Sequence, residues 1–95
     1  MNMPADARYA ISQDVVHRVI DGETIVLSLE SGTYFGLNAT GTRVWRLIEE
    51  GASRSAIIER ISREFAHPID AVQSDVDELL AALQSKGLVT TAPPA

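Results

Sequence analysis

The chain has 95 residues, 45% of them hydrophobic and 22% charged, so it can form one domain with a substantial core but no second one. Its 8 Lys and Arg residues against 13 Asp and Glu residues give a formal net charge of −5, which argues against binding to nucleic acid or to an anionic membrane. The absence of cysteine excludes disulfides, thiol nucleophiles and thiolate metal sites.

The two ends of the chain lack clear patterning. Residues 1–13 show no regular period, and residues 90–95 end in Ala-Pro-Pro-Ala, so we expect flexible tails around a single domain at residues 14–89. Residues 1–9 carry polar side chains where a signal peptide is apolar, and no apolar run approaches the length of about 18 residues that a membrane span requires. We therefore expect a cytoplasmic protein.

Three strands are predicted in the first half of the domain. Residues 15–20 and 23–29 are rich in β-branched and alternating apolar side chains, and Asp21-Gly22 between them is typical of a type I′ hairpin turn. Residues 30–32 form a second turn before a third strand at residues 33–37. Short turns between consecutive strands predict an antiparallel meander whose edges are the first and third strands.

From about residue 40 the apolar spacing becomes helical. A first helix is capped by Asn38 or Thr40 and ends at Gly51, and a second helix is capped by Ser53. The apolar residues expected to face the core are Val44, Trp45, Leu47 and Ile48 in the first helix, and Ile57, Ile58, Ile61 and Phe65 in the second.

A third helix follows the break at Pro68. Asp70 at the N-cap and Gln73 three residues later resemble a capping box, and Gly87 with Leu88 predicts a Schellman ending. Its apolar stripe consists of Val72, Val76, Leu79, Leu80 and Leu83. Three strands followed by three helices predict an α+β domain in which the helices cover the apolar face of the sheet.

The sequence offers little for catalysis or metal binding. His17 and His67 lie 50 residues apart, and neither has a partner at metal-ligand spacing. No nucleophile or phosphate-binding motif occurs, and Asp75 with Glu78 has no accompanying base and is typical of a solvated acidic face. We expect no catalytic residue, no metal site and no cofactor, and hence no enzyme.

A small DNA-binding regulator is the alternative that the helices leave open. Two helices joined by residues 66–69, beside a sheet, resemble a winged helix-turn-helix. The first two helices concentrate five arginines, namely Arg43, Arg46, Arg54, Arg60 and Arg63. Glutamates interleave with them, however, and the third helix carries Asp70, Asp75, Asp77 and Glu78 against Lys86 alone. Carboxylates at the position of base contacts repel phosphate, so we expect no nucleic acid partner.

The edge of the third strand is unprotected. Residues 33–37 contain neither charge nor proline, and Gly36 would let another backbone approach closely. Such an edge fits an extended peptide that adds itself to the sheet. Tyr34 and Phe35 must point to opposite faces, so we expect one of them in the core and the other available to a ligand.

An ordered set of short motifs covers about residues 14–89. It contains Leu-Glu-Ser-Gly-Thr-Tyr-Phe-Gly-Leu-Asn-Ala-Thr-Gly at residues 29–41, followed by Val44-Trp45, Gly51-Ala52-Ser53, Glu64-Phe65, Asp75-Val76 and Gly87-Leu88-Val89. The set resembles PqqD-like proteins, which are named for coenzyme PQQ synthesis protein D and are also called RiPP recognition elements. It is closer to the stand-alone proteins of lasso-peptide gene clusters, because Ser-Gly-x-Tyr-Phe-x-Leu-Asn replaces the Pro-Glu-containing stretch of the PQQ-pathway member.

This resemblance implies a winged-helix-like, non-catalytic domain. Such a domain binds the leader segment of a ribosomally made precursor peptide as a strand beside the third strand, in a cleft walled by the last helix. The partners implied are that leader and, in lasso-type systems, a transglutaminase-like leader peptidase and an asparagine-synthetase-like cyclase or other modifying enzyme. A structural subunit that docks on an enzyme without peptide specificity is a third possibility.

The cleft is assigned to one strand and one helix face. Main-chain groups of residues 34–37 are expected to supply the hydrogen bonds, and the third helix one wall. The expected peptide-binding residues are Thr33, Tyr34, Phe35, Gly36, Leu37, Val72, Asp75, Val76 and Leu79.

Overall fold

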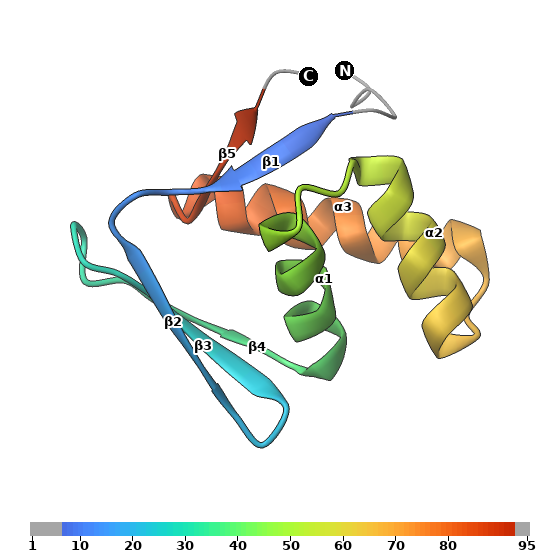
Figure 1. Cartoon of the computed structure of the whole chain (residues 1–95), viewed down its shortest axis with the longest axis horizontal. Coiled ribbons are helices and arrows are strands. Elements are labelled where there is room, and N and C mark those ends of the chain that lie inside the picture. The colour runs from blue at the N-terminus through green and yellow to red at the C-terminus, as the bar shows by residue number, and fades with distance from the viewer. Residues whose placement is uncertain (1–6, 93–95) are drawn as a thin grey trace.

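The computed structural model of the chain describes residues 7–92 (Figure 1). The elements are β1 (Arg8–Ile11), β2 (Val15–Ile20), β3 (Glu23–Ser28), β4 (Tyr34–Leu37), α1 (Ala39–Glu49), α2 (Arg54–Phe65), α3 (Ile69–Ser85) and β5 (Val89–Ala92). The predicted α+β class is confirmed, with an antiparallel meander followed by three helices. None of the helices in the described range is long and apolar enough to cross a bilayer.

The meander has β3 in its centre and β2 and β4 at its edges, as predicted. Asp21 and Gly22 between β2 and β3 have φ values of 53° and 81°, the two positive angles that a type I′ turn requires. This turn matches the right-handed twist of the flanking strands and so sets their register, in which Val15 pairs with Ser28 and Ile20 with Glu23.

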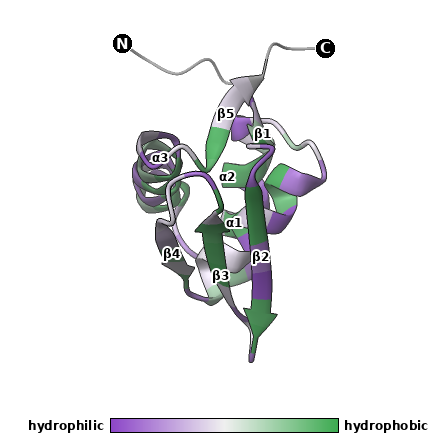
Figure 2. Cartoon of the chain, turned by 90° about the vertical axis from the view of Figure 1, so that its left-hand side faces the viewer, coloured by the Kyte–Doolittle hydropathy of each residue, from purple (hydrophilic) through white to green (hydrophobic). Residues whose placement is uncertain are grey.

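The two faces of the meander have different surroundings. Thr24, Val26 and Leu37 are buried on the inner face, which packs against α1. The hydroxyl of Thr24 donates to that of Thr42 in α1 at 2.8 Å, so even the polar inner-face group is paired. The opposite face carries large exposed side chains, and Figure 2 shows it with the helices behind the strands. Those side chains are Val16, Ile20, Ile25 and Tyr34.

Local capping signals fix most helix ends. The Asn38 side chain accepts from the Gly41 amide at 2.9 Å, which decides between the two predicted caps, and Ser53 caps α2 as predicted. At the end of α3 the Leu88 amide donates to the Leu83 carbonyl at 2.9 Å, and the Gly87 amide to the Gln84 carbonyl at 3.0 Å. These two bonds are the predicted Schellman ending.

The predicted capping box of the third helix is wrong. The N-cap of α3 is Pro68, with φ −57° and ψ 137°, and among residues 7–92 no side chain caps this end. The helix can begin at Ile69 because proline has no amide hydrogen to leave unpaired, and its carbonyl accepts from the Val72 amide at 3.1 Å. Asp70 consequently lies inside the first turn, where its negative charge interacts favourably with the positive N-terminal end of the helix dipole.

Both predicted tails contain a strand, so the domain boundaries at residues 14 and 89 are wrong. β1 and β5 form a second, two-stranded antiparallel sheet in which Arg8 pairs with Ala92 and Ile11 with Val89. Tyr9 is 3% exposed in the core, and the Ala7 carbonyl accepts from the Arg54 amide at 2.7 Å. The remaining parts of the predicted tails, residues 1–6 and 93–95, lie outside the described residues.

The predicted apolar stripes meet in one core. All four predicted residues of α1 are buried, and the helix stripes differ from expectation only in Phe65 and Leu79, which are partly buried against the core. Trp45 lies at the centre and is 1% exposed. This core joins the inner face of the meander to the three helices (Figure 1). Side chains of β1 and β5 also belong to it.

An arginine–glutamate pair joins α1 to α2. Arg43 Nε donates to Glu64 Oε1 at 2.7 Å and Arg43 Nη2 to Oε2 at 3.0 Å, a bidentate geometry. These hydrogen bonds lower the pKa of Glu64 below its usual 4.5, with a smaller contribution from Arg60. A carboxyl whose pKa is lowered in the folded state stabilises the fold above its unfolded pKa and loses that contribution as the pH falls through the folded value.

We therefore predict that the Arg43–Glu64 pair adds to the unfolding free energy at neutral pH and that this contribution is lost in acid. Wild type should exceed Glu64→Gln in unfolding free energy at pH 7, and this difference should shrink as the pH falls below about 4.5, where Glu64 becomes protonated and resembles Gln. Urea unfolding of both proteins between pH 7 and pH 3 measures it. A difference that is independent of pH would contradict the prediction.

Candidate functional site: a groove beside β4

Two residues of β4 have main-chain groups free along its outer edge. The Thr33 carbonyl accepts from the Ser28 amide at 3.0 Å, and in an antiparallel ladder such bonded pairs alternate along the strand. The register pairs Phe35 with Val26 and Leu37 with Thr24, so these two residues bond to β3 while Tyr34 and Gly36 direct their N–H and C=O groups outwards. The expectation that all four residues offer ladder bonds is therefore wrong for Phe35 and Leu37.

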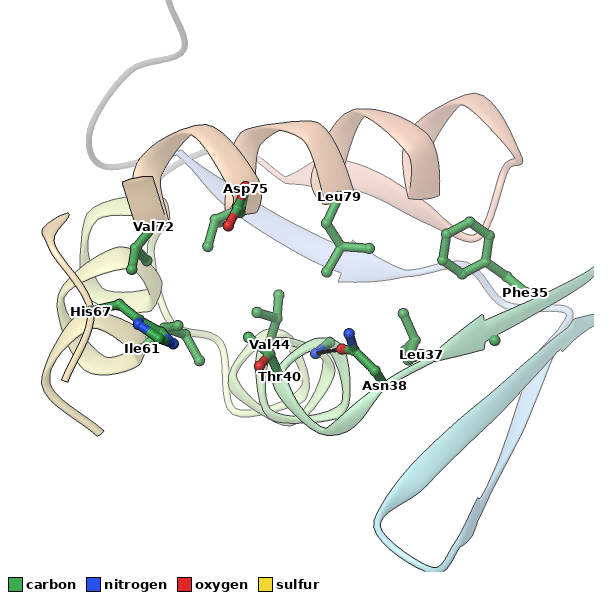
Figure 3. Close-up of a pocket in the computed structure, with 13 residues that line it drawn as sticks. Phe35, Leu37, Asn38, Thr40, Val44, Ile61, His67, Val72, Asp75 and Leu79 are labelled. Carbon is green, nitrogen blue, oxygen red and sulfur yellow. Dashed lines mark hydrogen bonds between the residues drawn. The ribbon is translucent and has the colours of Figure 1, made fainter. Parts of the chain in front are cut away.

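The free edge opens onto a groove of about 480 Å³ between β4, α1 and α3 (Figure 3). Its lining consists of Phe35, Gly36, Leu37, Asn38, Thr40, Gly41, Val44, Ile61, His67, Val72, Asp75, Val76 and Leu79. Apolar side chains from all three helices and from β4 thus meet beside a strand edge that has no further neighbour within residues 7–92. This arrangement can receive an extended backbone at the edge and apolar side chains in the groove.

Most of the predicted peptide-binding residues lie together in this groove. Those that line it are Phe35, Gly36, Leu37, Val72, Asp75, Val76 and Leu79. Thr33 and Tyr34 are not in the lining. Tyr34 is 69% exposed and shares the outer face of the sheet with Leu27, because side chains alternate along a strand. Phe35 packs against the core, so the two aromatics do lie on opposite faces as expected, and Phe35 also lines the groove.

The floor of the groove was missed by the sequence prediction. Thr40, Gly41 and Val44 share one face of α1 and line the groove. In Figure 3, Thr40 and Val44 lie past the end of β4, with Ile61 of α2 beyond them. A Cβ at Gly41 would come within 3.2 Å of two side-chain carbons of Leu37, so glycine lets α1 approach the strand this closely. The usable signal was the spacing of residues 40, 41 and 44, which places them together on a helix that starts where the strand ends.

The groove has one acidic side chain in its lining and a lysine at one end. Asp75 projects from α3 and is exposed, and no ion pair involves it in the described part of the chain. The Lys86 ammonium lies 5.8 Å from the centroid of the Phe35 ring. The charges at the groove are therefore sparse and of opposite sign.

The histidines are not brought together. His17 stacks edge-on against Trp45 with ring centroids 5.8 Å apart and lies 3.8 Å from a Glu49 carboxylate oxygen, whereas His67 lines the groove. Within residues 7–92 no three His, Asp or Glu side chains are grouped so that they could hold a metal ion.

The helix arginines that suggested DNA binding are mostly engaged with carboxylates. Arg54 donates to both carboxylate oxygens of Asp77 at 2.7 and 2.6 Å and joins α2 to α3. The other pairs are Arg43 with Glu64 and Glu50, Arg60 with Glu64, and Arg63 with Glu59. Side chains neutralised in this way do not form the basic stripe that phosphate contacts require.

Comparisons with known proteins agree with this geometry. The family model described as coenzyme PQQ synthesis protein D (PqqD) matches residues 23–89. Among solved structures, TbiB1 in complex with the TbiA(beta) leader peptide is similar, with 41% sequence identity and a TM-score of 0.80. The match covers 84% of this chain and 93% of that chain. No curated protein is significantly similar to the chain.

Proposed function

The chain belongs to the PqqD family, and we propose that it is an adaptor that binds the leader segment of a ribosomally made precursor peptide as a strand added to β4. The leader would pair with the outward main-chain groups of Tyr34 and Gly36 and place alternate side chains in the groove. Binding of this kind needs no catalytic group from the adaptor.

One observation carries this proposal. The edge of β4 is unpaired within residues 7–92 and borders a largely apolar groove, in a chain that is 41% identical to a protein solved with a leader peptide. A backbone ladder contributes affinity with little dependence on sequence, at about 0.5–1.5 kcal/mol per hydrogen bond. The groove beside it then selects side chains, which is what an adaptor for one class of peptide requires.

We propose lasso-peptide biosynthesis as the pathway, supported by the Ser-Gly-x-Tyr-Phe-x-Leu-Asn run at residues 31–38. The enzymes served would then be a transglutaminase-like leader peptidase and an asparagine-synthetase-like cyclase. A cytoplasmic location fits this role, because precursor peptides are made there.

The DNA-binding alternative is not favoured. Its basic side chains on α1 and α2 are largely paired with carboxylates, and α3 carries an excess of acids. Counterion release, which supplies most non-specific affinity for DNA, requires unpaired cations facing the phosphates.

A binding titration separates these functions. The labelled probes are the TbiA(beta) leader peptide, the leader of the precursor encoded beside this chain, and random duplex DNA at physiological salt. We expect micromolar or tighter binding of at least one leader and no binding of DNA. The proposal would be contradicted if the protein bound DNA but bound neither leader. It would also be contradicted if the protein co-purified with a modifying enzyme but bound neither leader.

A further inference from the structure

The groove has an acidic side chain, Asp75, along its α3 wall, and a basic one, Lys86, lies beside Phe35 at one end. Asp75 lies on α3 beyond Leu79, and Lys86 follows the C-terminal end of the same helix beside Phe35. In Figure 3, Phe35, Leu79 and Asp75 follow one another along the groove. Leu37, Val44 and Val76 contribute apolar surface to the groove, and Asn38 and Thr40 are polar members of the same lining. The surface between the two charges is therefore mainly apolar.

The two charges are available to a ligand. Asp75 and Lys86 are both exposed, and among residues 7–92 neither takes part in an ion pair. This distinguishes them from the charged residues of α2, all five of which pair within the domain. Asp75 is also the acidic member of a lining that is otherwise apolar or uncharged apart from His67.

Their separation matches a short strand. Eleven residues of helix at about 1.5 Å each separate the two positions by roughly 16 Å. An extended peptide rises about 3.3 Å per residue, so roughly five of its residues span this distance. A single bound strand can therefore contact both charges.

The direction of the strand then determines the order of its charges. β4 runs from the Phe35 end towards the Leu37 end, and an antiparallel partner, the more stable pairing per residue, runs the opposite way. Its N-terminal part passes Asp75 and its C-terminal part reaches Lys86.

We infer that the groove selects peptides with a basic residue followed, about four or six residues later, by an acidic one, an even spacing that points both to the same face of the strand, with apolar inward-facing residues between them. This inference rests on the proposed function and names the class of peptide that the same site accepts. Peptides with the reverse charge order would place like charges together at both ends, which disfavours them in the antiparallel direction.

Selection from a displayed library tests the inference. The library carries extended peptides of roughly 12 residues, long enough to pass both ends of the groove, with random charges flanking an alternating apolar centre. The baits are wild type, the double variant Asp75→Lys/Lys86→Glu, and Glu78→Lys. The double variant leaves the net charge at −5, and Glu78 is exposed on α3 but does not line the groove.

Wild type and Glu78→Lys should enrich peptides with the basic residue first, and the double variant should enrich the reverse order. Resynthesised peptides of the two orders should differ in affinity at least about tenfold, with opposite preference for the two proteins. Circular dichroism verifies that each bait is folded. Enrichment with no charge order, or the same order for both proteins, would overturn this inference and leave the adaptor function standing. Failure to enrich any peptide would contradict the adaptor function itself.

Discussion

Gly36→Pro should weaken leader binding at least about tenfold, or about 1.4 kcal/mol, while the domain stays folded. The Gly36 amide faces the free edge of β4, so proline removes a hydrogen-bond donor that only an added strand uses. The proline ring also occupies the space where that strand must lie. Proline is tolerated at such edge positions because no bond within the sheet is lost, and a Cβ at Gly36 would meet no other atom of residues 7–92 within 4 Å.

Gly36→Ala is the matched control for this substitution. It adds a Cβ but keeps the amide hydrogen, so leader affinity should remain within about threefold of wild type. Isothermal titration of the three proteins with one leader peptide, together with their circular dichroism spectra, gives the comparison. Equal affinity of a folded Gly36→Pro protein would place the peptide away from β4.

Tyr9→Ala should lower the free energy of unfolding by about 3–5 kcal/mol, the usual cost of removing a buried aromatic ring. Tyr9 is 3% exposed in β1, and two hydrogen bonds join Arg8 and the preceding Ala7 to residues outside the β1–β5 sheet. Arg54 donates to Ala7, and the Arg8 guanidinium donates to the Gly51 carbonyl. A loss of this size is a large part of the stability of a domain of this length.

Two controls separate packing from other effects at Tyr9. Burial raises the pKa of the Tyr9 hydroxyl, which has no hydrogen-bond partner within residues 7–92, so Tyr9→Phe should stay within about 1 kcal/mol of wild type. Tyr34→Ala removes the same ring from an exposed position and should cost less than about 1 kcal/mol. Urea unfolding measures all four proteins. An unchanged Tyr9→Ala protein would mean that residues 8–11 form a tail after all.

Structure that depends on neighbouring residues was readable from the sequence. The Asp21-Gly22 turn, the Asn38 and Ser53 caps and the Gly87 ending each follow from the conformational preferences of a few adjacent residues. The Pro68 start of α3 shows the limit of such signals. The sequence there predicts Asp70 as the N-cap, but the N-cap is Pro68. The Pro68 carbonyl, and not the Asp70 side chain, accepts the hydrogen bond at the start of the helix.

Structure that depends on distant residues was not readable. β1 is four residues long and pairs with a strand about 80 positions away, and its sequence, Arg-Tyr-Ala-Ile, is too short to show a period. Its stability comes from the docking of Tyr9 into a core that the helices build. The groove walls on β4 and α3 could be predicted from an unprotected strand edge and an apolar helix stripe. The presence of Ile61 and His67 in the lining could not be predicted, because it depends on how α2 packs.

The pairing of β1 with β5 makes this domain a transferable module. Arg8 and Ala92 are partners in the register, so the first and last residues of the two strands are neighbours, and no residue of either strand lines the groove. Insertion of residues 8–92 into a surface loop of another protein would therefore require almost no separation of the host's loop ends. A modifying enzyme that carried the domain in this way would hold its peptide at a fixed local concentration without obstructing the strand edge.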